Sequence, residues 1–246
     1  MYPVIHIAIP SYALMAATGG FLVMIFIYSR IGKYGLPFMD FIKMFVTSII
    51  FGFFGSRVVY IISRLTWLLT NFSFNNLLTS IIGGGLVFYG GLLGVLLGIY
   101  IYCKKYNINH KKIYNMIAPS VPLFHAFGRI GCFMSGCCYG VALKTPLILF
   151  GSIRFERIPT QLIEAIFEMF LFVVIFILQK KHKDKDFLKI YMITYAIFRF
   201  FIEFLRGDDV RGFFFGISTS QVISLGICIF YIILSIRREK TQIPHS

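Results

Sequence analysis

The chain has 246 residues, of which 58% are hydrophobic, 18% aromatic and only 14% charged, and its mean hydropathy is +0.80. A soluble fold of this length could not bury so much apolar side chain, so the composition predicts a polytopic membrane protein. The formal net charge of +14 would suggest nucleic acid in a soluble protein, but no predicted extramembrane segment is long enough for that role. Five cysteines are too few and too unevenly spaced for a disulfide scaffold.

Seven apolar stretches are each long enough to cross a bilayer as a helix. They cover residues 12–28, 41–62, 86–103, 113–134, 161–178, 188–205 and 217–236. Pro119 and Pro122 interrupt the fourth stretch, which we expect to be kinked or broken. The first stretch lacks the basic segment and cleavage site of a signal peptide, so we expect it to be retained. The predicted fold class is an all-α membrane protein, with a single polytopic domain over residues 1–246.

The positions of lysine and arginine predict how these helices are oriented. Fifteen of the 24 basic residues follow the first, third, fifth and seventh stretches, and twelve of those fifteen are lysine. These loops are therefore predicted to be cytoplasmic. An odd number of crossings then places the N-terminus outside and the C-terminus in the cytoplasm.

The other nine basic residues are eight arginines and one lysine. Arginine stays charged and presents a planar fork that matches phosphate oxygens. For Arg64 and Arg154, anchoring at lipid phosphates is the simpler interpretation. Arg129, Arg199 and Arg206 lie in or beside apolar helices, where a charged side chain costs free energy. We therefore favour a functional role for these three arginines.

Arg199, Glu203 and Arg206 are spaced i, i+4 and i+7, so they are predicted to line one helical face. A carboxylate between two guanidiniums can hold both in fixed positions and still leave a surplus positive charge. The alternative is a structural ion-pair network that joins helices.

The fifth stretch opens with Pro159, which suits a helix start. Gln161, Glu164 and Glu168 then share one helical face. We expect at least one of these acids to be a counter-ion of the arginines described above.

Residues 127–140 contain four glycines together with Arg129. This composition predicts a departure from regular helix, which is tolerated at membrane depth only where it lines a cavity or is buried in protein. We interpret the segment as the wall of a polar pocket open to the outer face, where glycine lets backbone N–H groups approach an anion.

Gly90, Gly94 and Gly98 repeat every four residues and predict a closely packed helix face. Tyr89, beside this face, is predicted either near the centre of the bundle or in an aromatic belt. The cysteines Cys132, Cys137 and Cys138 do not have a recognised zinc spacing, so no metal site is predicted. A disulfide from Cys132 is feasible, but space-filling thiols are the favoured interpretation.

The segment 128–140 resembles the Gly-Arg-x-Gly-Asn-Phe-x-Asn-Gly-Glu-x-x-Gly motif of bacterial prolipoprotein diacylglyceryl transferases. The matching positions are Gly128, Arg129, Gly131, Phe133, Gly136 and Gly140. Residues 159–164, 199–206 and 218–224 resemble the family's Pro-Ser/Thr-Gln-Leu-Tyr-Glu, Arg-x-x-x-Glu-Phe-x-Arg and Ser-Met-Gly-Gln-x-x-Ser segments. Tyr12 corresponds to a tyrosine of the family, and the similarity runs in order over nearly the whole chain.

The resemblance implies a multi-pass enzyme of the bacterial plasma membrane. It would transfer the diacylglyceryl group from phosphatidylglycerol to the lipobox cysteine of a prolipoprotein signal peptide, releasing glycerol phosphate, with no cofactor. Arg129 would hold the headgroup, and Arg206, oriented by Glu203, would be a second clamp. The catalytic residues implied are Arg129, Arg206, Tyr89 and Glu203. The substrate-binding residues implied are Arg129, Tyr12, Gly128, Ser135, Gly140, Gln161, Glu164 and Arg199.

This chain departs from the family pattern at the position of a histidine, which is Tyr89 here. It also departs at three motif positions, which are Cys132, Cys137 and, as a milder change, Ser135. Tyr89 could serve as a hydrogen-bonding group or as a base. Two alternatives stay open, a non-catalytic binder of anionic phospholipid and a related transferase with another acceptor; a thiol oxidoreductase is the weakest. The transferase hypothesis predicts that changing the three clustered cysteines to serine leaves most activity.

Overall fold

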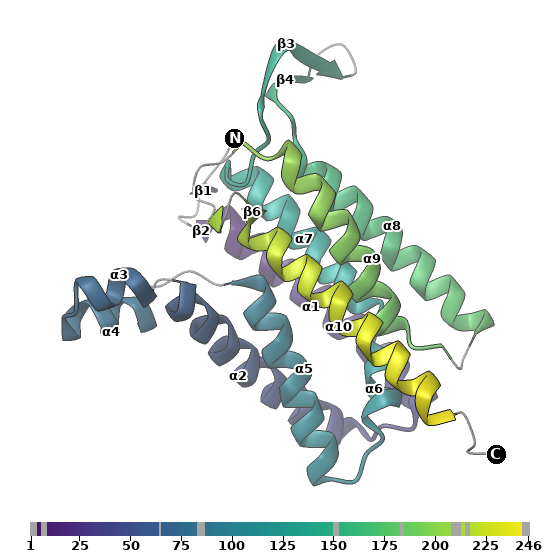
Figure 1. Ribbon diagram of the computed structural model, residues 1–246. Helices are drawn as coiled ribbons and strands as arrows, with labels where there is room; N and C mark the ends of the chain where they lie inside the picture. The colour runs from purple at the N-terminus through teal and green to yellow at the C-terminus, as the bar shows by residue number, and fades with distance from the viewer. Residues whose placement is uncertain are drawn as a thin grey trace. The chain divides into compact units, whose positions relative to one another are not determined.

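The computed structural model describes residues 4–5, 9–63, 65–82, 87–149, 153–182, 185–207, 213–214 and 217–242. Most of them are helical, as the composition predicts (Figure 1). The α-helices are α1 (Ser11–Tyr34), α2 (Phe38–Ser63), α3 (Leu65–Thr70), α4 (Phe74–Ile82), α5 (Phe88–Lys105), α6 (His110–Ile117), α7 (Ser120–Ser135), α8 (Thr160–Lys181), α9 (Phe187–Ile202) and α10 (Thr219–Gln242). Arg64 and residue 86, where the third apolar stretch is predicted to begin, lie outside the described residues.

Short strands accompany the helices as antiparallel pairs. They are β1 (Val4–Ile5) with β2 (Ile9–Pro10), β3 (Ala142–Leu149) with β4 (Ile153–Arg157), and β5 (Phe213–Phe214) with β6 (Ile217–Ser218). The register of β3 and β4 shifts between Ala142 and Leu147, so the hairpin is irregular near its base. The sequence reasoning predicted helices only and missed these pairs, as well as the short helices α3 and α4.

Three helices of the described chain are long and apolar enough to cross a membrane: α1, the segment Phe38–Ile62 of α2, and α8. The segment Thr219–Leu234 of α10 is apolar but shorter. The predicted class of a helical membrane protein is therefore supported by helix length and composition.

The fourth apolar stretch is broken where its prolines predicted a break. Helix α6 ends at Ile117, and α7 begins at Ser120 with Pro119 at its N-cap position. Proline has no N–H to donate, so a helix start accommodates it better than a helix interior does. The Ser120 hydroxyl donates to the Ile117 carbonyl over 2.6 Å and so satisfies one of the carbonyls that the break exposes.

The chain forms two compact units, residues 28–116 and residues 1–27 with 117–246. In the unit of residues 28–116, α2 packs against α5 through glycine. A β-carbon added at Gly55 would collide with the Gly90 carbonyl oxygen, and one added at Gly94 would collide with the Phe51 carbonyl oxygen. This confirms the close-packed glycine face that the four-residue repeat predicted.

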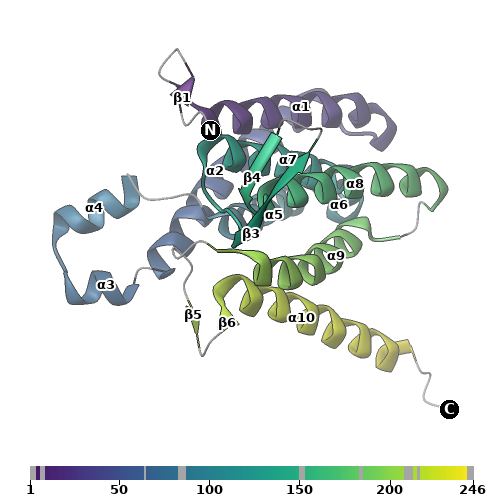
Figure 2. The ribbon, with the colours of Figure 1, turned by 90° about the horizontal axis from the view of Figure 1, so that it is seen from above.

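In the other unit, α7 packs on α8, α8 on α9, and α9 on α10. Figures 1 and 2 show α8, α9 and α10 running side by side. The rings of Phe167 on α8 and Phe198 on α9 stack with centroids 3.7 Å apart. On the other side of α7, a β-carbon at Gly131 would lie 3.2 Å from Tyr12 Cα, so the N-terminal part of α1 packs closely there.

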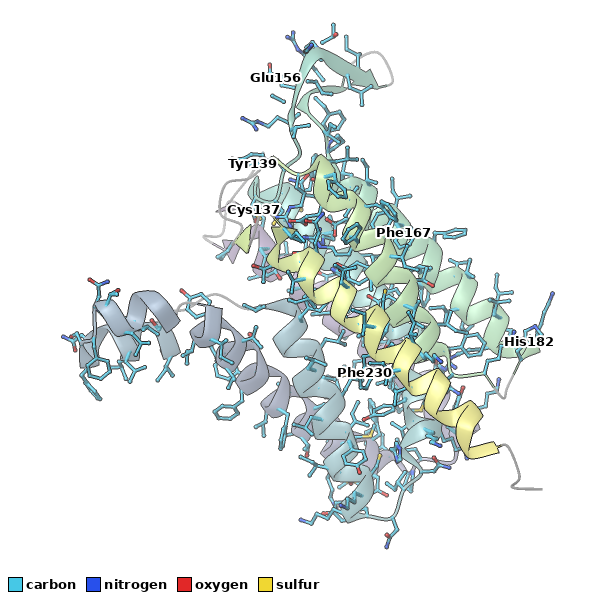
Figure 3. The ribbon with its side chains drawn as sticks, viewed as in Figure 1. Cys137, Tyr139, Glu156, Phe167, His182 and Phe230 are labelled. Atoms are coloured by element: carbon cyan, nitrogen blue, oxygen red, sulfur yellow. The ribbon has the colours of Figure 1, made fainter. Side chains whose placement is uncertain are left out.

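The β3–β4 hairpin projects from the end of this unit at which α7 ends and α8 begins. Figure 3 places Cys137 and Tyr139 at that end, Glu156 on the hairpin, and His182 at the opposite end of α8. The loop after α7 and the lysines at the end of α8, Lys180 and Lys181, therefore lie at opposite ends of one helix layer.

Candidate active site

In the unit of α7 to α10, two helices face each other with basic side chains on α7 and carboxylates on α8. On α7, His125 and Arg129 are one turn apart, and on α8 Glu164 and Glu168 are one turn apart. Arg129 Nε lies 2.8 Å from Glu164 Oε2, and His125 Nδ1 lies 2.8 Å from Glu168 Oε1. Both carboxylates are fully buried. The shared face predicted for Glu164 and Glu168 is confirmed, and Glu164 is a counter-ion of Arg129 as expected.

Helix α9 contributes a second guanidinium to the same carboxylate. Arg199 Nη1 lies 2.9 Å from Glu164 Oε1, and its Nη2 lies 2.8 Å from Glu203 Oε2. The same Nη2 donates to the Ser220 hydroxyl over 3.1 Å. Arg199 is only 3% exposed, and a buried guanidinium is stable there because carboxylates and a hydroxyl surround it.

Arg206 completes an unbroken chain of ion pairs. Its Nη1 lies 3.7 Å from Glu203 Oε2, so Glu203 lies between Arg199 and Arg206 as predicted. The order of charges is arginine, glutamate, arginine, glutamate, arginine, from Arg129 through Glu164 to Arg206. This series of ion pairs therefore has a guanidinium at each end. It carries one more positive than negative charge, which is the surplus that the sequence predicted.

The prediction that residues 199, 203 and 206 share one regular helical face is wrong at its last member. Helix α9 ends at Ile202, a 3₁₀ turn covers Glu203–Leu205, and Arg206 is extended. The cause is a backbone pairing: Arg206 forms an antiparallel bridge with Gly140, and Val141 N–H donates to the Leu205 carbonyl over 2.9 Å. The Arg206 side chain still reaches Glu203, because a 3₁₀ turn also brings residues three apart to one side.

The glycine-rich segment is more regular than predicted. Residues 127–135 are part of α7, and the backbone leaves the helix only at Gly136, whose φ of +72° is the left-handed conformation common after a helix. Gly131 is accommodated in the helix because it lets α1 approach. A β-carbon at Gly128 would meet no atom within 4 Å, so its predicted role in substrate binding stays a prediction.

Gly140 lies where three backbone segments meet. Its N–H donates to the Ile158 carbonyl over 2.9 Å, and Gly207 N–H donates to the Tyr139 carbonyl over 3.0 Å. A β-carbon at Gly140 would lie 2.5 Å from the Ile158 carbonyl oxygen, so only glycine fits. The structure thus gives Gly140 a positioning role for Arg206, and its predicted contact with substrate stays a prediction.

The first turn of α8 secures the loop that follows α7. Gln161 Nε2 donates to the Cys137 carbonyl over 2.6 Å, and the Thr160 hydroxyl donates to the Cys138 carbonyl over 2.9 Å. Both side chains are buried. Gln161, predicted to bind substrate, is therefore seen to position the loop.

The remaining predicted residues fall in different places. Ser135 is the last residue of α7. Tyr12, on the first turn of α1, is close enough to interact electrostatically with Arg129 and with the cysteines of residues 132–138. Tyr89 lies on the first turn of α5, in the unit of residues 28–116, and its catalytic role stays a prediction.

Sequence reasoning missed an aromatic cluster around His125. Tyr191 donates to Glu168 Oε1 over 3.4 Å, and the Tyr195 hydroxyl lies 3.5 Å from His125 Nε2. Tyr191, Tyr195 and Arg199 are spaced i, i+4 and i+8 on α9, which is the signal that could have placed them on the face of the site.

Three cysteines gather beside the ion-pair chain. The Sγ atoms of Cys132, Cys137 and Cys138 all lie within 4.8 Å of one another, and Cys137 is exposed. Hydrogen bonds from the thiols of Cys132 and Cys137 lower the pKa of the Cys138 thiol, and the charges of Arg129 and Arg206 lower it further. Among the described residues, this thiol cluster is the group with the ligands and the spacing to hold a metal ion.

Comparisons of the sequence with known proteins point to one family. The profile of the prolipoprotein diacylglyceryl transferases matches residues 2–237. A Clostridium tetani protein named phosphatidylglycerol–prolipoprotein diacylglyceryl transferase is 35% identical over 244 residues, which cover 94% of this chain and 96% of that protein. A Clostridium perfringens protein of that name, numbered 2, is 34% identical, with 77% and 75% covered. One from Streptococcus uberis is 30% identical, with 97% and 94% covered. The chain belongs to the prolipoprotein diacylglyceryl transferase family.

Proposed function

We propose that this enzyme transfers the diacylglyceryl group of phosphatidylglycerol to the cysteine thiol of a prolipoprotein lipobox and releases glycerol phosphate. The observation that carries the proposal is the ion-pair chain that ends on Arg129 and Arg206. Arg129 meets Glu164 through its Nε, 2.8 Å from the carboxylate oxygen, and the Arg129 side chain stays 12% exposed. Its fork is thus oriented by a carboxylate at one edge and available to a phosphate at the other.

The chemistry explains why fixed arginines are needed. In the reaction, the bond between the glyceryl carbon and a phosphate oxygen breaks, and a carbon–sulfur bond forms. The electron pair of the broken bond stays on the phosphate, so negative charge grows on that oxygen in the transition state. Guanidiniums that Glu164 and Glu203 already hold in place stabilise this charge without reorganising, which is the main source of such catalysis.

The same proposal places the site at the outer face of a plasma membrane that the chain crosses seven times, with the N-terminus outside. The support is the separation of charges along α8: Lys180 and Lys181 lie at its C-terminal end, and the loop of Cys137 lies at the other end (Figure 3). Lysine-rich ends remain in the cytoplasm, so the arginine site faces outward. The partners are then phosphatidylglycerol and signal peptides arriving in the bilayer.

The test is transfer from labelled phosphatidylglycerol to a lipobox peptide, in membranes that contain the protein or its Arg129→Ala variant. We expect thioether product from the parent protein and a loss of at least about 100-fold in the variant, as for the removal of one fixed donor to a developing oxyanion. Arg154→Ala, on the exposed hairpin, is the matched arginine control and should transfer normally.

Arg129→Lys separates transfer from simple lipid binding. A bidentate fork is needed to hold a phosphate in one orientation, whereas a point charge suffices to attract an anionic headgroup. Lysine should therefore retain phosphatidylglycerol binding and lose most transfer. Full transfer by Arg129→Lys would contradict this role of the Arg129 fork. Saturable phosphatidylglycerol binding with no product from the parent protein would favour a lipid binder or a different acceptor.

A further inference from the structure

The three thiols of the cluster have the geometry of a metal site. Zinc binds thiolates at about 2.3 Å, so two thiolates on one tetrahedral ion are about 3.8 Å apart. The Sγ atoms of Cys132, Cys137 and Cys138 lie within 4.8 Å of one another, so small side-chain rotations bring all three to one ion. The spacing along the chain did not predict this, because the turn after α7 folds residues 137 and 138 back toward 132.

That turn is held firmly from both sides. Cys137 N–H donates to the Cys132 carbonyl over 3.1 Å, and the buried side chains of Gln161 and Thr160 bind the carbonyls of Cys137 and Cys138. Cys138 has a φ of +58°, a left-handed conformation that costs a residue with a β-carbon about 1 kcal/mol or more. A costly conformation fixed by buried hydrogen bonds sets the direction of the Cys138 Cα–Cβ bond, so that only a side-chain rotation is left to place its thiol.

Charge and access also fit a metal that takes part in chemistry. Three thiolates and a divalent ion have a net charge of −1, and Arg129 and Arg206 are close enough to Cys138 to stabilise it. Cys137 is exposed, so the cluster has an open side. Three protein ligands with an open fourth position are the arrangement of catalytic zinc, whereas structural zinc has four protein ligands.

We propose that Cys132, Cys137 and Cys138 bind a thiophilic divalent ion such as zinc, and that the acceptor cysteine of the substrate occupies the fourth position as a thiolate. This inference rests on the proposed transfer reaction, which needs an ionised acceptor thiol. A thiol that coordinates a metal is deprotonated outright. The cluster would thereby ionise the acceptor thiol. Tyr89, which stands at the family's histidine position, would then not be needed as the base.

The step balances without any oxidant or reductant. The acceptor thiol loses its proton when its sulfur joins the ion. A sulfur electron pair then forms the bond to the glyceryl carbon, and the bond from that carbon to the phosphate oxygen breaks with its electrons on oxygen. The released proton balances the phosphate monoester, and the neutral thioether, a weak ligand, leaves the ion.

The first test is metal binding by the full-length protein in detergent, with its thiols reduced and metals removed. Co²⁺ is the probe, because thiolate ligation gives a charge-transfer absorption and tetrahedral coordination gives strong d–d bands. We expect one equivalent to bind in the parent protein and in Arg129→Ala. Cys132→Ser, Cys137→Ser and Cys138→Ser should each lose these bands, and Cys228→Ser on α10 is the matched control that should keep them.

The second test asks whether the acceptor thiol joins the ion. A lipobox peptide should change the d–d bands of the cobalt protein, and the same peptide with serine in place of its cysteine should not. Metal-free protein, or the triple cysteine-to-serine variant, should transfer about 30-fold more slowly at pH 7, because a free thiol of pKa about 8.5 is only a few per cent ionised there. This deficit should shrink about tenfold for each unit of pH toward 8.5, whereas a structural defect would not follow the pH.

The outcomes separate this inference from the proposed function. Absence of the cobalt bands, or full transfer by protein shown to be metal-free, overturns the metal site and leaves the transferase standing. If the triple variant transfers more slowly by the same factor at all pH values, the proposal that the metal ionises the acceptor thiol is wrong. Cobalt binding and a peptide-induced change without any thioether product support the metal site and overturn the proposed transfer.

Discussion

Two sets of helices in this protein are packed by opposite means. In the unit of residues 28–116, α2 and α5 approach so closely that Gly55 and Gly94 leave no space for a β-carbon. In the unit of α7 to α10, the helices are joined by arginines and buried carboxylates, with Glu164 between two guanidiniums. Both arrangements can hold helices together in an apolar medium, the first by close backbone contact and the second by pairing of charges.

This difference in packing indicates which set of helices is expected to hold the reaction site. A glycine interface stabilises a fold without polar side chains, and an apolar replacement for a buried ion pair is often as stable as the pair itself. A chain of five charged groups is therefore not needed for packing alone. Its presence between α7, α8 and α9 is the reason that we propose the reaction site in this unit and treat the α2–α5 contact as packing.

The largest effect is expected when the charged interface loses its central carboxylate. Glu164→Gln keeps the shape of the side chain but leaves Arg129 and Arg199 without the shared counter-ion. We expect a loss of about 3–5 kcal/mol in the free energy of unfolding, as when one partner of a buried ion pair is removed, and a nearly complete loss of transfer. Denaturant unfolding in detergent micelles measures the first, and labelled phosphatidylglycerol the second.

Glu156→Gln is the control for that substitution, because Glu156 lies on the exposed hairpin. It should change neither quantity. If Glu164→Gln were as stable and as active as Glu156→Gln, the ion-pair chain would have no part in either the fold or the reaction.

The next largest effect is expected at the glycine interface. Gly94→Val places a branched side chain against the Phe51 carbonyl of α2, so the two helices must separate. Overpacking of this kind costs about 1–3 kcal/mol. Gly226→Val on α10 is the matched control, because a β-carbon there meets no atom within 4 Å. Equal thermal stability of the two variants would mean that the close contact does not hold α2 to α5.

Much of this contrast could be predicted from the sequence, because helical periodicity is local. The spacing of Glu164 and Glu168 placed both on one buried face, and the prolines of the fourth stretch located its break. The glycine repeat of α5 predicted a close contact. The surplus of positive charge also followed from counting arginines in apolar surroundings.

The rest depended on contacts between distant segments. Arg206 leaves the helix because its backbone pairs with Gly140, 66 positions earlier, and no local pattern announces that bridge. The pairing of His125 with Glu168 needed the order in which α7 packs on α8. The thiol cluster needed the left-handed Gly136, after which the chain turns back on the helix end, and the left-handed Cys138 that follows.

That cluster also changes an expectation drawn from the sequence. If the three thiols only fill space, a triple cysteine-to-serine variant should keep most of its transfer activity. The observed proximity of the three sulfur atoms leads to the opposite prediction near neutral pH. The same variant therefore decides between the two interpretations.

A smaller effect is expected one turn below Arg129, at the contact between His125 and Glu168. His125→Leu removes a partner from Glu168, which is buried but can take up a proton and become neutral. We expect a loss of about 1–3 kcal/mol in unfolding free energy, the cost of an unsatisfied buried polar group. Glu168→Leu in the same background should restore part of it, because both polar partners are then gone. A loss as large as that of Glu164→Gln would show that Glu168 stays charged.

The smallest effect is expected at the ion pair of the hairpin, which tests the charged interface by contrast. Arg154 Nη2 and Glu156 Oε1 are 4.0 Å apart, and their side chains are 65% and 78% exposed. Water screens such a pair, so Arg154→Ala should change the free energy of unfolding by no more than about 0.5 kcal/mol. Transfer should be unchanged, since the pair lies outside the chain from Arg129 to Arg206. A loss of more than about tenfold in transfer, with unchanged stability, would instead indicate that the hairpin contacts the lipid headgroup or the peptide. The reaction site would then include the hairpin as well as the helices α7 to α9.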